Sequence, residues 1–396
     1  MLNGVDLRAR QALAEQIRED SWEAQLSIGV AAYPVPGGRC RVDTEPMRLG
    51  STRVARAFGI EQRCEDTAGG DVLDPVGSLL VALGASVADS VVTALTGEGC
   101  GPSVVEVLPC AWFPAGPPDG EPGEDGPARL SYEIRIEGDV SAGQARRAVA
   151  AACARGSAHR TLAEPNEIRA VVQTARDVHL TSRPVPAPAQ PRPAVRRRTA
   201  RVTWEVGTHV LAEVDGVRAE SDQPKQLFGA DLAPSAQEYV LAALAAEALR
   251  YSADSGPAAD GPPASVHSSG RVDLRGPYTA GDAPAGLRNI LVQLLPADPA
   301  ATGDASASAG DGDGDGDGEG ATGPVAAMRR WLAEGDALRL VRDAHPIAVS
   351  LVLDGTPVAL PAEGTGETHH PDHASDSHNS HDTYDTHDTK ERHRAP

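Results

Sequence analysis

The chain has 396 residues, a formal net charge of −20 and only 3% aromatic residues. This length exceeds one ordinary hydrophobic core and predicts two domains, with cores built mainly from Val, Leu, Ile and Ala. The acidic balance argues against nucleic acid or an anionic membrane surface as the main partner, because both require a concentrated basic patch.

The cysteines are few and scattered along the first part of the chain. An odd set without a CxxC pair predicts neither a disulfide framework nor a zinc site, and it fits a reducing compartment. Residues 1–20 lack an apolar signal core, so the sequence predicts a cytoplasmic protein. The five cysteines are Cys40, Cys64, Cys100, Cys110 and Cys153. No sequence motif indicates a cofactor.

The first elements in chain order are a helical lead-in at residues 1–24 and a first domain at residues 25–180. In that domain a strand-like segment at 53–62 leads through a polar turn into the most apolar run, residues 79–95. This run contains Gly, Ser and Asp and has no basic flanks. We therefore expect a buried core helix there and not a membrane span.

The same succession of elements occurs a second time. After each long helix come a strand-like segment, an amphipathic helix and a final strand. The first set comprises residues 130–138, 144–156 and 167–175. The second set begins with a strand at 209–221 and a long helix at 238–251, followed by 287–296, 325–338 and 347–355. The repetition predicts an α+β fold of two fused, equivalent domains, in which long apolar helices pack against antiparallel sheets.

Segments rich in Pro, Gly or acidic residues separate these elements. We expect a Gly/Pro insertion at 114–128 and a Pro/Arg-rich linker at 181–199, which includes the basic run at 196–198. The second domain, residues 200–360, carries an acidic Gly/Asp insertion at 297–323 that is expected to be disordered.

Two segments could attract metal ions. The run GDGDGDGDGEG alternates carboxylates with glycine but lacks the spacing of an EF-hand, so we expect a solvated loop. The tail at 361–396 is rich in His and Asp and is expected to be disordered. Its His369, His370 and His373 could chelate zinc, nickel or copper weakly, without the fixed geometry of a specific site.

The second long helix, EYVLAALAAEALRY, contains one charge in an apolar setting, Glu247. A buried carboxylate must be paired, protonated or turned to water. Two interpretations stay open: an ion pair with an arginine such as Arg250, or a desolvated general acid or base. His345 and Asp343, just before the last strand, are candidates for the same pocket.

The second half carries SDQP (221–224), LAPSAQEYVLAALAA (232–246) and GLRNILVQL (286–294). The first half carries AGGDVLDPVGSLLVALGAS (68–86) and HRTLAEPNEI (159–168). In these segments and their order, the two halves resemble the OsmC/Ohr family of thiol-dependent hydroperoxide reductases. The resemblance implies an intertwined dimer fused into an intramolecular pseudo-dimer, and it leaves further homodimerisation open.

The chemistry of that family uses two cysteines in each unit. A thiolate on the long helix attacks the peroxide, and a second thiol resolves the sulfenic acid as a disulfide. By this resemblance the first cysteine falls on Ser86 and Glu247, and the second falls on Gly156 and Ala337. None of these four positions carries sulfur, so the ordinary peroxidase cycle is not available.

The partner carboxylate of the family falls on Glu238 in the second half and on Gly77 in the first. The favoured hypothesis is a non-peroxidase protein that binds a small, largely apolar ligand in the interface pocket, or an accessory protein. The first alternative is an enzyme that uses Glu247 as general acid or base, with Glu238 and His345 as further catalytic candidates.

A second alternative is residual hydroperoxide reduction by a displaced thiol. Cys153 lies one helical turn before Gly156, and Cys64 lies in the turn that leads to the first long helix. Either sulfur would have to reach the old pocket. The competing interpretation of Cys153 is a small apolar residue on a helix already rich in alanine.

Overall fold

The computed structural model describes most of the chain up to its C-terminal tail. The compact unit Met1–Leu360 holds almost all described residues, and Pro361–Pro396 form a separate unit. The expected insertion at 114–128, most of the one at 297–323, and His369, His370 and His373 lie outside the described residues. The described ranges are 2–64, 70–113, 129–173, 178–181, 196–253, 263–279, 283–296 and 323–361.

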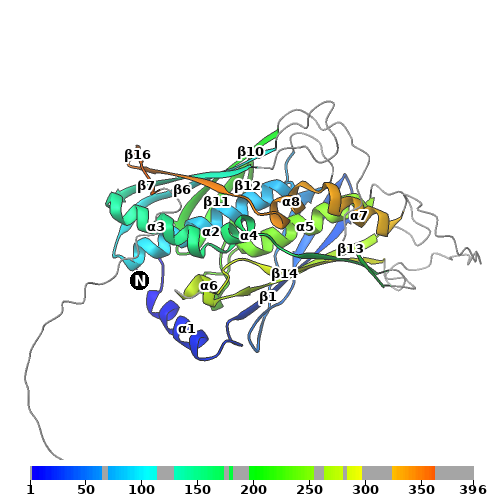
Figure 1. Ribbon diagram of the computed structural model, residues 1–396, viewed down its shortest axis with the longest axis horizontal. Coiled ribbons are helices and arrows are strands. Elements are labelled where there is room, and N and C mark those ends of the chain that lie inside the picture. Colours follow the sequence, from blue (N-terminus) through cyan, green and yellow to red (C-terminus); the bar gives the residue numbers. More distant parts are fainter. Residues whose placement is uncertain are drawn as a thin grey trace, which may run out of the picture. The chain divides into compact units, whose positions relative to one another are not determined.

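The described residues form a mixed α+β fold (Figure 1), so the predicted fold class is confirmed at this level. The helices are α1 (Leu7–Glu19), α2 (Pro75–Gly97), α3 (Ala142–Arg155), α4 (Ser157–Ala163), α5 (Ala236–Ala253), α6 (Arg275–Tyr278), α7 (Pro324–Glu334) and α8 (Asp336–Arg342), with a 3₁₀ turn at Lys225–Leu227. The strands before the linker are β1 (Gln25–Val35), β2 (Arg39–Thr44), β3 (Met47–Leu49), β4 (Thr52–Val54), β5 (Gly59–Arg63), β6 (Gly101–Phe113), β7 (Arg129–Asp139), β8 (Ile168–Gln173) and β9 (Val178–Thr181). Those after it are β10 (Arg196–Val206), β11 (His209–Val214), β12 (Val217–Ser221), β13 (Pro263–Asp273), β14 (Arg288–Pro296), β15 (Ile347–Leu353) and β16 (Thr356–Val358).

The strands form two sheets, and each sheet contains strands from both halves of the sequence. The nine-stranded sheet runs β4-β3-β1-β13-β14-β8-β9, with β2 and β5 attached beside β1. The seven-stranded sheet runs β12-β11-β10-β6-β7-β15-β16. The first strands of each half therefore pair with the middle strands of the other half, through β1 with β13 and β10 with β6. The halves are intertwined.

Both sheets are mixed, which differs from the antiparallel sheets expected from the sequence. The final strand of each half lies parallel to a strand of the other half, as β8 does beside β14 and β15 beside β7. A parallel pairing requires a long crossover connection. Here the paired strands come from different halves, so the chain that connects them contains several helices and strands.

The two long helices lie side by side between the sheets (Figure 1). Helix α2 packs on the seven-stranded sheet and α5 on the nine-stranded sheet. Most residues of α2 and almost all residues of α5 are buried, as the apolar pattern predicts. By length and composition α2 is also the one described helix that could cross a membrane, but most of its apolar window is buried inside the protein. A Cβ at Gly84 would lie 2.4 Å from Val202 Cγ2, so glycine permits this close packing on β10.

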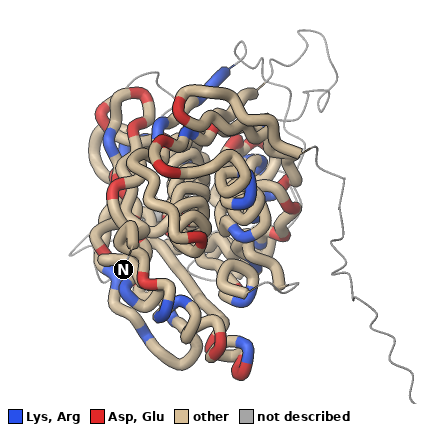
Figure 2. Tube along the Cα trace, turned by 90° about the vertical axis from the view of Figure 1, so that its left-hand side faces the viewer, with Lys and Arg blue, Asp and Glu red and all other residues tan. Residues whose placement is uncertain are grey.

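The basic run at 196–198 belongs to a strand and not to the linker in which it was expected. Strand β10 begins at Arg196 and pairs with β6. Arg196 forms an ion pair with Asp336, and Arg198 pairs with Asp74 and Asp215. Basic and acidic residues are interspersed along the described chain in Figure 2. These arginines therefore tie surface elements together.

Candidate functional site

Two equivalent sites lie where a long central helix meets the start of a short helix. In the first half Ser86 of α2 lies beside α4, and in the second half Glu247 of α5 lies beside α8. Gly156 is the N-cap of α4 and Gly335 is the N-cap of α8. The amphipathic helix expected at 325–338 is thus broken at Gly335, whereas the one expected at 144–156 corresponds to α3 and ends just before Gly156. By this geometry the equivalent of Gly156 is Gly335, and Ala337 lies two residues further on.

The Glu247 carboxylate is buried and accepts three hydrogen bonds. Its Oε2 atom accepts from the Trp331 indole Nε1 at 3.0 Å and from the Leu338 backbone N at 3.0 Å. Its Oε1 atom accepts from the Ala337 backbone N at 2.9 Å. Glu247 is only 3% exposed. The carboxylate therefore satisfies the free N–H groups at the start of α8, and none of its hydrogen-bond donors in the described chain is an arginine.

The surroundings of Glu247 are tightly packed. The Trp331 side chain is fully buried, and a Cβ at Gly335 would lie 2.5 Å from Glu247 Oε2. Burial raises the pKa of Glu247, and the charge of Asp336 adds to the shift. The backbone donors of Ala337 and Leu338 lower the pKa by less than burial raises it. The site is filled by the carboxylate and its donors.

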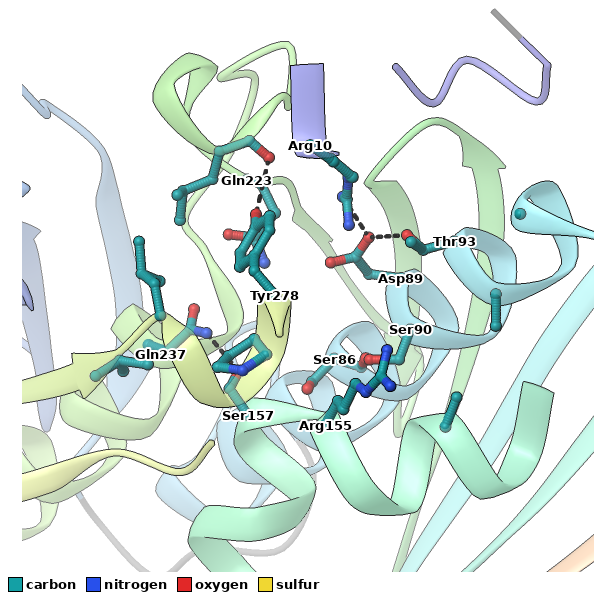
Figure 3. A pocket seen from close by; sticks show the side chains of 17 residues that line it. Arg10, Ser86, Asp89, Ser90, Thr93, Arg155, Ser157, Gln223, Gln237 and Tyr278 are labelled. Carbon is teal, nitrogen blue, oxygen red and sulfur yellow. Dashed lines mark hydrogen bonds and ion pairs between the residues drawn. The ribbon is translucent and has the colours of Figure 1, made fainter. Parts of the chain in front are cut away.

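The first-half site has a smaller side chain and an open cavity. Ser86 Oγ accepts a hydrogen bond from the Ala158 backbone N at 3.1 Å, and its carbonyl accepts one from Ser90 Oγ at 2.8 Å. Beside Ser86 lies a cavity of about 270 Å³, which we call the Ser86 pocket (Figure 3). Ser157 lies on the same wall and accepts a hydrogen bond from Gln237 of α5. The pocket is therefore walled by both halves.

The walls of the Ser86 pocket carry two arginines and one carboxylate. Arg10 of α1 forms an ion pair with Asp89 of α2 at 3.0 Å. Arg155, the last residue of α3, is exposed and has no hydrogen bond or ion pair with the rest of the described chain. The side-chain Oε1 of Gln223 and the Nε of Arg10 are buried without a partner. Of the charged side chains that line the pocket, Arg155 is thus the one without an ion-pair partner among the described residues.

Glu238 takes part in a buried ion pair. Its carboxylate accepts from Arg56 at 2.7 Å and 3.1 Å, and both side chains are fully buried. Arg56 also binds Asp231 and donates to the Ala233 carbonyl at 3.1 Å. Arg56 comes from the first half of the chain, so the pair joins the two halves. The equivalent place in the first half is Gly77, whose backbone N–H is capped by Asp74 at 2.6 Å.

The catalytic candidates are not gathered into one constellation. His345 Nε2 donates to the Arg339 carbonyl at 3.1 Å, and its backbone N donates to the Leu162 carbonyl at 3.3 Å. The second of these bonds joins the segment before β15 to α4, which precedes β8. Asp343 forms a partly exposed ion pair with Arg342. The hydrogen-bond donors of Glu247 include neither residue.

None of the described cysteines lines the Ser86 pocket. Cys153 Sγ lies 3.4 Å from the Tyr132 hydroxyl, which also bonds His159 Nδ1 at 3.0 Å. Cys64 follows β5 and contacts Cys40. In the part of the chain that the structure describes, no group of three or more His, Cys, Asp or Glu side chains could hold a metal ion.

Sequence reasoning missed several residues of both sites. Trp331 and Arg155 could have been predicted. An alignment of Arg155–Gly156 with Glu334–Gly335 places both residues near the two helix starts. Arg10 and Gln223 carry no such signal, because they reach the pocket only through long-range packing. Comparison with known protein families finds no matching family model, and comparison with curated proteins finds no match either.

Proposed function

We propose that this protein binds a small anionic molecule in the Ser86 pocket and does not reduce hydroperoxides. The observation that carries the proposal is Arg155, for which the described residues supply no hydrogen-bond or ion-pair partner and which lines a cavity together with serine, threonine and glutamine side chains. A carboxylate would pair with this guanidinium and accept from the amide and hydroxyl groups around it. The cavity of about 270 Å³ suits a ligand smaller than a drug molecule.

This ligand differs from the largely apolar one expected from the sequence. Two arginines line the pocket together with one aspartate, so its walls carry a net positive charge within a chain of net charge −20. An anion that is repelled by most of the surface would thus be attracted at this one place. Serine and glutamine side chains would then fix its orientation.

We further infer that the chain is a divergent, fused pseudo-dimer of the OsmC/Ohr type. Three features support this inference: the reciprocal exchange of strands, the central pair of long helices, and the repeated contact between a long helix and a glycine-capped short helix. The absence of sulfur at Ser86, Gly156, Glu247 and Ala337 supports the loss of peroxidase chemistry. Glu247 does not line the pocket, so its geometry favours a structural role over acid or base catalysis.

Calorimetric titration of the full chain with propionate and its neutral analogue propionamide tests the binding proposal. Propionate should bind about tenfold more tightly, because one partly exposed charged contact contributes about 1.4 kcal/mol. Arg155→Ala should remove this preference. Glu334→Ala changes the equivalent position of the second half and should leave binding unchanged. Equal affinities for the two probes, or a preference that survives in Arg155→Ala, would contradict the proposal.

A separate assay tests the loss of peroxidase activity. With cumene hydroperoxide and dithiothreitol, the protein should consume peroxide no faster than free cysteine at the same thiol concentration. Faster turnover that disappears when all five cysteines are changed to serine would mean that a displaced thiol has restored the activity. The two assays are independent, so each part of the proposal can fail alone.

A further inference from the structure

Two of the five cysteines share one face of a β-ladder. Strands β2 and β5 are antiparallel, with Cys40 opposite Gln62 and Arg39 opposite Arg63. The Cys64 backbone N donates to the Gly38 carbonyl at 2.8 Å, so the same register continues for one more residue. Because side chains alternate between faces, Cys40 and Cys64 point to the same side as diagonal neighbours.

The two thiols are also in contact. A side-chain hydrogen bond with Cys64 raises the pKa of Cys40, and burial raises it further. Cys40 is fully buried, whereas Cys64 is partly exposed at the end of the ladder. The pair thus has one sulfur that a reagent can reach and one that only a neighbouring side chain can reach. This asymmetry is typical of dithiols in which an exposed thiol reacts first.

We propose that Cys40 and Cys64 form a reversible disulfide through exchange with a small-molecule disulfide. The Cys64 thiolate attacks one sulfur of the reagent, which forms a mixed disulfide and releases the first small thiolate. The Cys40 sulfur then attacks Cys64, which closes the protein disulfide and releases the second thiolate. The two protons lost by the protein thiols protonate the two released thiolates. Both electrons pass from the protein to the reagent.

This disulfide would act on the contact between the two halves. The chain between Cys40 and Cys64 contains Arg56, whose guanidinium binds Glu238 and Asp231 of the second half. Closing the loop restricts the unfolded chain more than the native ladder, where Cys40 and Cys64 are already diagonal neighbours on one face. The oxidised protein should therefore unfold at a higher temperature. This inference does not depend on the Ser86 pocket.

The test uses the full chain, equilibrated with mixtures of oxidised and reduced glutathione, quenched with acid, unfolded in denaturant and then alkylated, so that buried thiols are reached as well. Mass spectrometry should show that two of the five thiols become protected, in a peptide pair that links Cys40 with Cys64. Cys64→Ser should keep Cys40 alkylatable, whereas Cys40→Ser should carry glutathione on Cys64. The control Cys153→Ser should still form the linked pair.

Two results would overturn the inference. In one, all five thiols of the wild-type protein stay alkylatable at every glutathione ratio. In the other, wild-type Cys64 accumulates the glutathione adduct and no linked peptide appears. The glutathione adduct in Cys40→Ser shows only that glutathione can reach Cys64. The wild-type protein therefore decides between a closed disulfide and a lone exposed thiol, and this result does not depend on how well Cys40→Ser folds.

Discussion

Ser86 and Glu247 hold equivalent places on α2 and α5, and each accepts a hydrogen bond from the start of a short helix. Ser86 accepts one backbone N–H and leaves a cavity beside it, while Glu247 accepts three N–H groups and fills its site. The longer glutamate side chain thus occupies the space beside the helix start that the shorter serine side chain leaves open.

The residues around the two sites differ in the same sense. Arg155 ends α3 beside the open pocket, and Glu334 ends α7 at the equivalent place. The second half has Glu238 near the start of its long helix, where it pairs with Arg56 of the first half, and the first half has Gly77 at the equivalent place. At the two helix starts, the Glu247 carboxylate is held by internal hydrogen bonds, whereas Arg155 has no ion-pair partner among the described residues.

The largest expected effect comes from the buried ion pair between Arg56 of the first half and Glu238 of the second, which has no counterpart at Gly77. Arg56→Ala leaves Glu238 buried without its partner and should lower the free energy of unfolding by about 3–5 kcal/mol. The control Arg39→Ala removes an exposed pair with Asp71 and should cost less than about 1 kcal/mol. Urea unfolding measures both. Equal losses of unfolding free energy would mean that the buried pair stabilises the protein no more than the exposed pair does.

The two helix-start contacts should differ in strength. Glu247→Ala leaves the donors of Trp331, Ala337 and Leu338 unpaired and should cost about 2–4 kcal/mol. Ser86→Ala removes one acceptor and should cost about 1 kcal/mol. Thermal unfolding of both variants gives the comparison. A loss in Ser86→Ala as large as that in Glu247→Ala would show that the open site is equally structural.

The pH dependence of stability should carry the signature of Glu247. Burial raises its folded pKa above the ordinary value of 4.5, so the unfolded chain loses this proton first as pH rises. The free energy contributed by Glu247 is full below pH 4.5 and falls as pH rises through its folded pKa. Glu247→Gln should flatten this part of the curve, measured by urea unfolding at a series of pH values. An unchanged curve would mean that another titratable group causes this pH dependence.

His159 of the first half should act in the opposite direction. Burial, with a smaller contribution from Arg160, lowers its pKa from 6.5 to about 4. The folded protein therefore prefers neutral His159, and the stability it contributes is present above pH 6.5 and lost as pH falls through about 4. His159→Leu copies the equivalent Leu338 and should reduce this loss. NMR titration of the imidazole checks the pKa, and an ordinary value near 6.5 would contradict the account.

The sequence predicts local structure better than the way in which its parts assemble. Apolar runs locate α2 and α5, and the repeated order of elements indicates two related halves. The exchange of strands between halves, the parallel β8–β14 pairing and the place of β10 depend on contacts between distant segments, which no local pattern encodes. Glu247 could be singled out from the sequence because it is a charged residue within an apolar helix. Its partners could not be predicted, because Trp331 and the start of α8 lie far along the chain from Glu247.

The measurement that tests the central claim most directly is an NMR titration of the isotope-labelled full chain with propionate. If the two equivalent sites have diverged into an open and a filled one, the backbone amides of Ser86 and Ala158 should shift progressively. Those of Ala337 and Leu338 should stay in place. Shifts of similar size at both sites would mean that Glu247 does not close the second one, and shifts at neither would mean that the Ser86 pocket binds no carboxylate.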